Sequence, residues 1–425
     1  MSELALRDAG TLRVPLRIAL LGYRSNPYSG GQGIYLKYIS QALVDAGHQV
    51  DVISGEPYPE LDERVGLIKL PGLNLFAQES HLTALRARHL LSTTDFFEWF
   101  SMASGGFPEP YTFGRRVARH LRQPGHGYDI IHDNQSLSYG VLRLQQHTPL
   151  LTTIHHPITW DRDIALNHAP SWQQRLLIRR WHNFLNMQRA VAKKLRHIVT
   201  VSERSRKDIG DAFDIDSARI HVIYNGIDTE VFRPEASIAR NPWQLITTAS
   251  ADQPLKGTQH LIPAFARLIR EFPKLRLVFI GRPKPGGETE KLMARHGIKD
   301  RIRFVHGISP EAIRTLYASS AIAVVPSEYE GFGLPAGEAM ACSVPVVSTD
   351  GGALPEVVGD AAVVVPVGDP QALGDAIAGL LRDDGARERL GRIGRQRIIE
   401  RFSWQRAAEQ MTQLYQQIAG PYHES

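Results

Sequence analysis

The stretch that most constrains this chain is an apolar run followed by a loop rich in glycine and glutamate. Residues 321–325 (Ala-Ile-Ala-Val-Val) are apolar and partly β-branched, and they predict a buried parallel strand. The loop Pro326-Ser-Glu-Tyr-Glu-Gly-Phe-Gly-Leu-Pro335 follows, with glycine amides that can approach a ligand and a final proline that suits a helix start. Glu330 then lies on the loop and Glu338 in the first turns of that helix. Open α/β sheets bind ligands at this end of a strand, and a helix start favours phosphate.

Glu330 and Glu338, with seven residues between them, frame the sequence Gly-Phe-Gly-Leu-Pro. This arrangement resembles the donor-site signature of glycosyltransferase family 4, whose members are retaining enzymes of the GT-B fold. The resemblance implies an α/β protein in which two doubly wound Rossmann-like domains face each other across a cleft. It implies an acceptor-side domain at 1–235, joined by a C-terminal helix at 404–425, and a donor-binding domain at 236–403.

Composition agrees with two globular domains. The chain has 425 residues, of which 43% are hydrophobic and 22% charged, and Lys and Arg exceed Asp and Glu by 49 − 44 = 5. This mild excess suits anionic ligands or an anionic membrane, and without charge runs we expect no nucleic-acid partner. Cys342 is the only cysteine, so no intramolecular disulfide can form. The first dozen residues lack an apolar block, and no run of about 18 apolar residues follows, so we expect a cytoplasmic protein.

The amino-terminal part begins with a second candidate phosphate site. Residues 17–23 predict a strand, Gly30-Gly-Gln-Gly33 a loop, and residues 34–43 a helix. Amides of such a loop point at an anion, but the spacing is not that of a dinucleotide fingerprint, and the next strand ends at Ser54 rather than an acid. An NAD site is therefore not expected. The family resemblance implies that Gly31 and Gly33 face the donor diphosphate.

Two adjacent histidines follow a predicted strand at 150–154. A histidine at the carboxyl end of a strand can act at the cleft. In family 4 a histidine after this strand lies beside the donor sugar, and His155 matches it best, whereas His156 stands where relatives often have a small or acidic residue. The alternative is a histidine satisfied by local backbone bonds, and the choice between His155 and His156 stays open.

Two other segments of this half allow more than one interpretation. Residues 96–111 are rich in aromatic side chains that can shape an acceptor pocket, contact lipid, or belong to an inserted helical pair. Residues 175–196 hold seven basic residues and no acid, with Leu177, Trp181, Phe184 and Leu195 on one helical face. Such a helix can lie on an anionic membrane at the inner face of the cell membrane, or can bury its apolar stripe in the core.

Basic residues of the carboxyl-terminal half suit a diphosphate. Lys256 precedes a predicted helix at 261–272, where a cation and a helix start can bind phosphate together. Family 4 usually has an arginine a few residues earlier, but this chain has Ala249-Ser-Ala-Asp-Gln253 there. We expect Arg282, after the strand at 277–281, to restore that charge.

The resemblance implies transfer of a sugar from a UDP- or GDP-linked donor, as co-substrate, to a glycan, lipid or small-molecule acceptor, with no cofactor and no metal. Asp161-Arg-Asp163 formally matches a metal motif of another transferase fold but follows no clear strand. We predict catalytic roles for His155, Glu330 and Lys256. Donor contacts are predicted for Gly31, Gly33, Lys256, Arg282, Gly307, Glu330, Gly331, Phe332, Gly333, Leu334 and Glu338, with Glu338 on the ribose.

Other functions remain as alternatives. A glycoside hydrolase would need its two carboxyl groups on opposite sides of the sugar, whereas a loop and the helix after it place Glu330 and Glu338 on one wall. A nucleotide-sugar epimerase of the same fold is closer, although the Gly-Phe-Gly-Leu-Pro sequence favours transfer. The missing arginine also allows a degenerate protein that binds sugar nucleotides without transferring the sugar.

Overall fold

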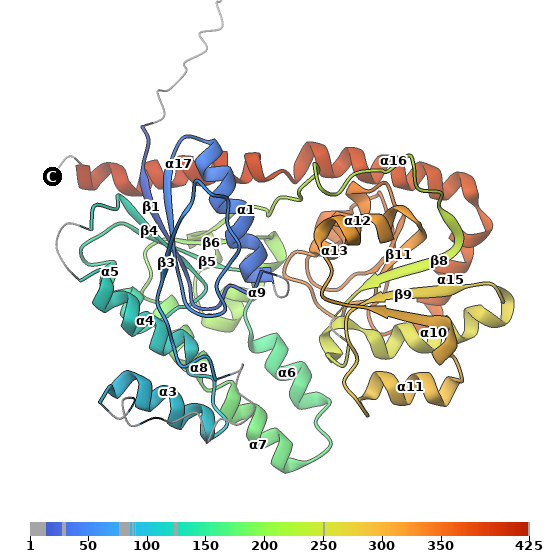
Figure 1. Ribbon diagram of the computed structural model, residues 1–425, viewed down its shortest axis with the longest axis horizontal. Coiled ribbons are helices and arrows are strands. Elements are labelled where there is room, and N and C mark those ends of the chain that lie inside the picture. The colour runs from blue at the N-terminus through green and yellow to red at the C-terminus, as the bar shows by residue number, and fades with distance from the viewer. Residues whose placement is uncertain are drawn as a thin grey trace, which may run out of the picture.

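The computed structural model describes residues 14–27, 31–75, 86, 89, 91–122, 126–249 and 251–423. Two separate parallel sheets, each flanked by helices, follow one another along this chain (Figure 1). Every strand pairing recorded within them is parallel. The structure therefore has the two Rossmann-like α/β sheets of a GT-B fold, as the sequence predicted.

The first sheet has seven strands in the order β3-β2-β1-β4-β5-β6-β7. Their bounds are β1 (Arg17–Gly22), β2 (Gln49–Ser54), β3 (Gly66–Lys69), β4 (Ile130–Asn134), β5 (Leu150–Ile154), β6 (Ile198–Thr200) and β7 (Ile220–Val222). Alternate residues of β1 enter two different hydrophobic cores, Ile18 and Leu20 on one face and Ala19 and Leu21 on the other. A strand buried on both faces needs a continuous apolar sequence, which is why residues 17–22 show no polar alternation.

The second sheet has six strands in the order β10-β9-β8-β11-β12-β13. Their bounds are β8 (Asn241–Thr248), β9 (Arg276–Ile280), β10 (Ile302–Val305), β11 (Ser320–Val325), β12 (Val346–Thr349) and β13 (Val363–Val365). All six residues of β11 are buried, with Ile322 and Val324 in one core and Ala323 and Val325 in the other. The predicted apolar strand is therefore the centre of this sheet.

Helices connect the strands on both sides of each sheet. In the first half they are α1 (Gly31–Asp45), α3 (Thr93–Ala103), α4 (Glu109–His120), α5 (Tyr139–Leu144), α6 (Thr159–Asn167), α7 (Trp172–Trp181), α8 (Phe184–Ala192), α9 (Glu203–Phe213) and the 3-10 turn η2 (Ser217–Arg219). In the second half they are η3 (Pro254–Lys256), α10 (Thr258–Glu271), α11 (Glu288–His296), η4 (Lys299–Arg301), α12 (Pro310–Ala318), α13 (Leu334–Ala341), α14 (Leu354–Val358), α15 (Pro370–Arg382), α16 (Asp384–Arg401) and α17 (Trp404–His423).

Each sheet has one point where the strand order reverses. In the first sheet it lies between β1 and β4, and in the second between β8 and β11. The loops that leave neighbouring strands there run to opposite faces and open a crevice, which is the usual ligand site of such sheets. The loop holding Glu330 follows β11, as predicted. The predicted loop at Gly30–Gly33 also follows β1, but Gly31, Gln32 and Gly33 are the first residues of α1, so the expectation that the helix begins at residue 34 was wrong. Both segments lie at reversal points.

The last helix, α17, returns to the first sheet. Figure 1 shows α16 and α17 following one another along the top of the view, across both sheets. Trp404, Met411 and Tyr415 of α17 are buried in the same core as β1 and α1. The Tyr415 hydroxyl lies 2.6 Å from Nδ1 of His132 on β4. The chain thus closes the core of its first half with its last helix, while the predicted domain limits 1–235 and 236–403 stay a prediction.

The basic segment 175–196 is not one helix, so that expectation was wrong. It divides into α7 and α8, which bury different amounts: α7 has no buried residue, whereas α8 buries Leu185, Met187 and Val191. Leu177 is 58% exposed and Leu195 1% exposed, so the predicted apolar stripe does not form a single face. Among the residues described, no helix combines the length and apolarity needed to span a bilayer.

Candidate functional site

The β11–α13 loop holds its carboxylate beside a cation. The Glu330 side chain accepts a hydrogen bond from Lys256 Nζ at 2.7 Å and one from Ser327 Oγ at 2.8 Å. Lys256 belongs to η3, which follows β8, the strand next to β11 at the reversal point. Glu330 is only 9% exposed, so this ion pair is more strongly coupled than a pair at the surface. The structure therefore brings two of the predicted catalytic residues together.

Glu338 lies on α13, one turn beyond the glycine that starts the helix. Gly333 precedes α13 with φ of 107°, a conformation that glycine adopts without strain, and Pro335 occupies the first turn. No hydrogen bond is recorded for the Glu338 carboxyl within the described ranges, and burial raises its pKa to about 8. A half-buried carboxyl group that accepts no hydrogen bond is unfavourable, so this position suits a ligand whose hydroxyl groups can donate to it.

The corresponding loops of the first sheet hold His155. Its Nε2 lies 2.7 Å from Oδ1 of Asn134, and its backbone N–H donates to Oε1 of Gln135 at 2.8 Å. Tyr35 of α1 packs edge-on against the ring at 4.8 Å. Burial lowers the pKa of His155 to about 3, so the ring is neutral near pH 7. No hydrogen bond of its Nδ1 is recorded with the described part of the chain.

The start of α1 lies beside this histidine. Gly31 and Gly33 belong to the first turn of α1, where backbone N–H groups have no helical partner. A Cβ atom on Gly33 would lie 2.1 Å from the carbonyl oxygen of Asn26, so only glycine fits this close approach. Asn134 donates to the carbonyl of Gln32 at 3.3 Å and so joins the start of α1 to His155. Gly30 and the preceding Ser29 lie outside the described residues.

His156 has different partners from His155. Its Nε2 lies 3.0 Å from Oδ2 of Asp161 on α6, and its ring also interacts electrostatically with Lys256 and Glu330. Burial disfavours the charged ring, but the Asp161 carboxylate outweighs burial and raises the pKa of His156. The surroundings therefore shift the two pKa values in opposite directions, since burial lowers the pKa of His155 and Asp161 raises that of His156.

The two halves meet at these same loops. Ser205 Oγ, on α9, is within 2.9 Å of the carbonyl oxygen of His155 and 3.1 Å of that of Gly331. Ser202 Oγ donates to the Gly331 carbonyl at 2.8 Å. A Cβ atom on Gly331 would lie 2.9 Å from the His155 carbonyl oxygen, which leaves no room for a side chain. The β5–α6 and β11–α13 loops are thus in direct contact.

Glu356 of α14 makes a second connection between the halves. Its carboxylate accepts the backbone N–H groups of Glu203 and Arg204 at 2.9 and 2.7 Å and the Tyr224 hydroxyl at 3.0 Å. Those N–H groups are at the start of α9, so a residue of the second half caps a helix of the first.

The remaining predicted donor residues differ in what they offer. The Phe332 side chain is 4% exposed and packs against Phe402, so the side chain belongs to the core. Leu334 packs on the same core. Arg282 is exposed after β9 and makes no hydrogen bond or ion pair within the described segments. Gly307 follows β10 at the sheet edge with φ of 64°. Gly331 and Gly333 shape the loop itself.

Several residues of the site were not predicted. His155 is hydrogen-bonded to Asn134, Gln135 and Ser205. Asp161 of α6 bonds to His156, and Glu356 of α14 caps α9. Asn134 ends β4 and Gln135 follows it, and β4 borders the reversal point, which is a signal that could have identified both residues. In the part of the chain that the structure describes, no group of three or more His, Cys, Asp or Glu side chains is placed to hold a metal ion.

Comparison with known proteins shows that each half of the chain matches a glycosyltransferase family model. Residues 29–231 match the family described as Glycosyltransferase Family 4, and residues 229–397 match the family described as Glycosyl transferases group 1. The chain is 42% identical over 406 residues to an MMP alpha-(1->4)-mannosyltransferase of Mycolicibacterium hassiacum, covering 94% of this chain and 98% of that one. It is 28% identical to a D-inositol 3-phosphate glycosyltransferase of Salinispora tropica, covering 96% and 87%.

Solved structures share the fold. Sucrose-phosphate synthase of Thermosynechococcus elongatus superposes with a TM-score of 0.72 at 25% identity, covering 96% of this chain and 100% of that one. The HepE protein of Anabaena in complex with UDP-glucose gives a TM-score of 0.68 at 18% identity, covering 94% and 99%. At such identities the second likeness speaks for the fold alone.

Proposed function

Since this chain belongs to the family 4, group 1 glycosyltransferases, we propose that it transfers a hexosyl group from a nucleoside diphosphate sugar to an acceptor hydroxyl, with retention of anomeric configuration and without a metal ion. The observation that carries this proposal is the meeting of the two reversal-point loops, where one Ser205 hydroxyl contacts both the His155 and the Gly331 carbonyl oxygens. A donor in the crevice between the sheets would touch the predicted residues of both halves.

The sugar is proposed to be mannose. The Mycolicibacterium relative is named as a mannosyltransferase that makes an alpha linkage, and this chain covers nearly all of it. An alpha product made from an alpha-linked diphosphate donor requires retention. Mannose is commonly activated as its GDP ester, so GDP-mannose is the first donor to test, with UDP sugars as the alternative.

In this reaction the protein has to stabilise the departing nucleoside diphosphate. The bond between the anomeric carbon and the phosphate oxygen breaks, the acceptor oxygen bonds to the same carbon on the same face, and the acceptor proton passes to the departing phosphate oxygen. Lys256, the free N–H groups at the starts of α1 and α13, and Arg282 are proposed to stabilise the negative charge that develops. No side chain is assigned as a nucleophile.

The other site residues are proposed to position the donor. Glu338, which lacks a partner among the described residues, accepts from the ribose hydroxyls, and Glu330 accepts from the hexose hydroxyls while it holds Lys256. Neutral His155 offers Nδ1 to the hexose, and His156 adds positive charge beside the Lys256–Glu330 pair. Gly307 and the backbone of Gly331, Phe332, Gly333 and Leu334 complete the donor pocket.

The experiment is a thermal-shift screen of GDP, UDP and their sugar esters, followed by transfer assays. A ligand at about 100 times its Kd adds roughly 2.7 kcal/mol to the free energy of unfolding, an easily measured shift. We expect a shift with one nucleotide, reduced in Glu338→Ala, and a product of alpha configuration by proton NMR, with a rate that EDTA leaves unchanged. No shift with any nucleotide would contradict the proposal.

The same assays separate the alternatives. An epimerase would convert the donor sugar without an acceptor and transfer nothing, and a degenerate binding protein would bind the donor but neither hydrolyse nor transfer it. Arg282→Ala should weaken nucleotide binding if this residue replaces the missing arginine, whereas unchanged affinity would remove that role.

A further inference from the structure

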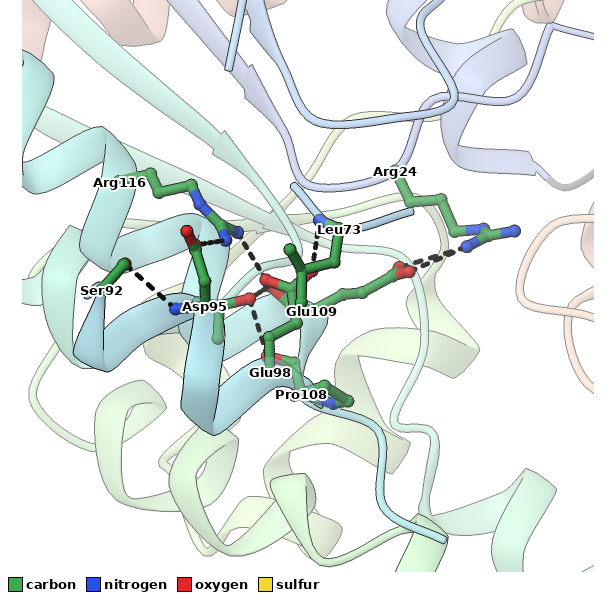
Figure 2. Close-up of polar contacts among 9 residues, drawn as sticks. Arg24, Leu73, Ser92, Asp95, Glu98, Pro108, Glu109 and Arg116 are labelled. Carbon is green, nitrogen blue, oxygen red and sulfur yellow. Dashed lines mark hydrogen bonds and ion pairs between the residues drawn. The ribbon is translucent and has the colours of Figure 1, made fainter. Parts of the chain in front are cut away.

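A separate cluster of charged side chains lies at the carboxyl edge of β1, beyond the residues assigned to the donor. Figure 2 shows Arg24, which follows β1, extending towards Glu109 at the start of α4. One guanidinium nitrogen of Arg24 lies 3.0 and 3.3 Å from the two carboxyl oxygens of Glu109. The Arg24 side chain is 31% exposed and that of Glu109 11%, so the pair forms the outer end of the cluster.

The inner end of the cluster is already satisfied. Arg116 of α4 donates to Asp95 and to Glu98 of α3, each at 2.6 Å, and Glu98 also accepts the backbone N–H of Leu73 at 2.8 Å (Figure 2). These bonds tie α3, α4 and the segment after β3 together. Because two carboxylates already engage Arg116, it contributes little to neutralising Glu109.

A small cavity opens beside this pair. Its volume is about 20 Å³, enough for one water molecule, and its lining includes the side chains of Tyr23, Glu56, Glu98, Glu109 and Arg116. The lining therefore holds three carboxylates and one guanidinium group, and Arg24, which bonds to Glu109 from outside the lining, adds a second guanidinium group. The cavity and its surroundings carry net negative charge when all three acids are ionised.

Hydrogen bonds connect this cavity to the donor side. The Tyr23 hydroxyl accepts from Nε2 of Gln32, which lies in the first turn of α1. The carbonyl of Gln32 accepts from Asn134, and Asn134 bonds to His155. The Arg24–Glu109 pair thus lies at the same edge of the first sheet as His155, and Gln32 of α1 and Asn134 of β4 lie between them.

Building on the glycosyl transfer proposed above, we propose that the Arg24–Glu109 pair binds the acceptor, and that this acceptor is an uncharged sugar rather than a phosphorylated one. A guanidinium donates and a carboxylate accepts, so together they match neighbouring hydroxyl groups, each of which can do both. A phosphate group would be repelled by Glu56, Glu98 and Glu109, while the positive charge of each guanidinium group is already offset by a carboxylate.

The protonation of Glu109 supports the assignment. Burial raises its pKa to about 7, although Arg24 and Arg116 oppose the shift, while Glu98 adds to it. Tyr23 also faces the cavity, and burial raises its pKa to about 12, so its hydroxyl stays neutral around that pH. Glu109 loses its charge as the pH falls through 7, so the KM for a neutral acceptor should rise there while the Kd for GDP does not change in parallel.

The test measures acceptor and donor separately. With GDP-mannose as donor, initial rates are compared for methyl α-D-mannopyranoside and for mannose 6-phosphate, in the native chain, in Glu109→Gln and in Arg24→Met. Glu63→Gln, an exposed acid between β2 and β3, is the matched control. The Kd for GDP and the midpoint of thermal unfolding are measured for every variant.

We expect at least a tenfold preference for the neutral acceptor in the native chain. We also expect about a tenfold rise in acceptor KM in Glu109→Gln and Arg24→Met, with the Kd for GDP unchanged, because a charged hydrogen bond is lost. Preference for the phosphorylated sugar, or an acceptor KM in both variants equal to that of Glu63→Gln, would overturn the inference while leaving transfer intact. Absence of transfer and GDP binding in the native chain would instead refute the function on which it rests.

Discussion

At the scale of single residues, Glu338 has the clearest consequence. It is a carboxyl group inside the crevice with no hydrogen-bond donor among the residues described, and burial raises its pKa from 4.5 to about 8. Burial favours the neutral carboxyl group, whereas hydrogen bonds from ribose hydroxyl groups would favour the carboxylate. Binding of a nucleotide should therefore release a proton from the protein near neutral pH.

The raised pKa predicts a stability change in Glu338→Gln. Between pH 5 and 8 the unfolded chain ionises Glu338 while the folded chain keeps it protonated, so the native free energy of unfolding falls as pH rises. The glutamine variant lacks this loss and should be more stable than the native chain by on the order of 1–3 kcal/mol at pH 8, with little difference at pH 5. Urea unfolding at both pH values measures it; a difference that does not grow with pH would contradict the shift.

A second residue-scale prediction concerns the charge on His156. The Asp161 carboxylate raises the pKa of His156 against the effect of burial, so the imidazolium is present below that pKa and lost above it. In Asp161→Asn the alkaline fall of kcat/KM should move to lower pH, because the ring deprotonates earlier. The pH–rate profile is the measurement, and His147→Gln, at an exposed histidine, is the control. An unmoved alkaline limb would exclude His156 from the transfer step.

The sequence predicted residues of this site when their signal was local. Glu330, Lys256 and Gly333 were found because a strand, a loop and a helix start are adjacent in the chain. Ser205 and Glu356 could not be assigned to the site, because their partners lie 126 and 153 residues away in the sequence. The sequence also could not predict that His155 bonds to Asn134 and His156 to Asp161, because these contacts depend on how the β5–α6 segment folds.

At the scale of elements, α7 is the helix that differs most from the sequence prediction. It was expected to continue into α8, yet Ser171 caps a separate helix that ends at Trp181, and none of its residues is buried. Trp172 is 73% exposed, and Leu176 and Leu177 are also largely exposed. Helical periodicity alone could not show the break, because residues 175–196 are apolar and basic on both sides of it.

The membrane contact predicted for 175–196 can be tested on α7. Exposed Trp172, Leu176 and Leu177 beside arginines suit an anionic lipid surface. We expect the chain to co-sediment with phosphatidylglycerol vesicles and a Trp172→Ser, Leu177→Ser double variant to do so at least fivefold less. Phosphatidylcholine vesicles are the control for charge. Equal sedimentation of the native chain and the variant would contradict a contact through α7.

At the scale of the whole molecule, the first half depends on the end of the chain. Trp404, Met411, Leu414 and Tyr415 of α17 complete the core shared by β1 and α1. Burying one such side chain stabilises by about 1.5–3 kcal/mol, so four of them contribute an amount comparable to the total stability of a domain. The two halves are therefore interdependent although their sheets are separate.

This dependence predicts the effect of truncation. A chain ending after Phe402 should lose the cooperative thermal transition of its first half, because it exposes the core that α17 covers. A chain ending after Gly420, which keeps those side chains, is the control and should unfold like the full chain. Differential scanning calorimetry distinguishes the two, and a native-like transition in the shorter chain would show that the first half folds without α17.

The cap that Glu356 places on α9 makes the separation of the two halves measurable. Two backbone amides, those of Glu203 and Arg204, are protected by a carboxylate that belongs to the opposite half. Any motion that separates α14 from α9 exposes both amides to solvent at once, while the rest of α9 keeps its hydrogen bonds. The hydrogen–deuterium exchange rate of these two amides would therefore report how often α14 and α9 separate, and so how often the two halves of the molecule move apart.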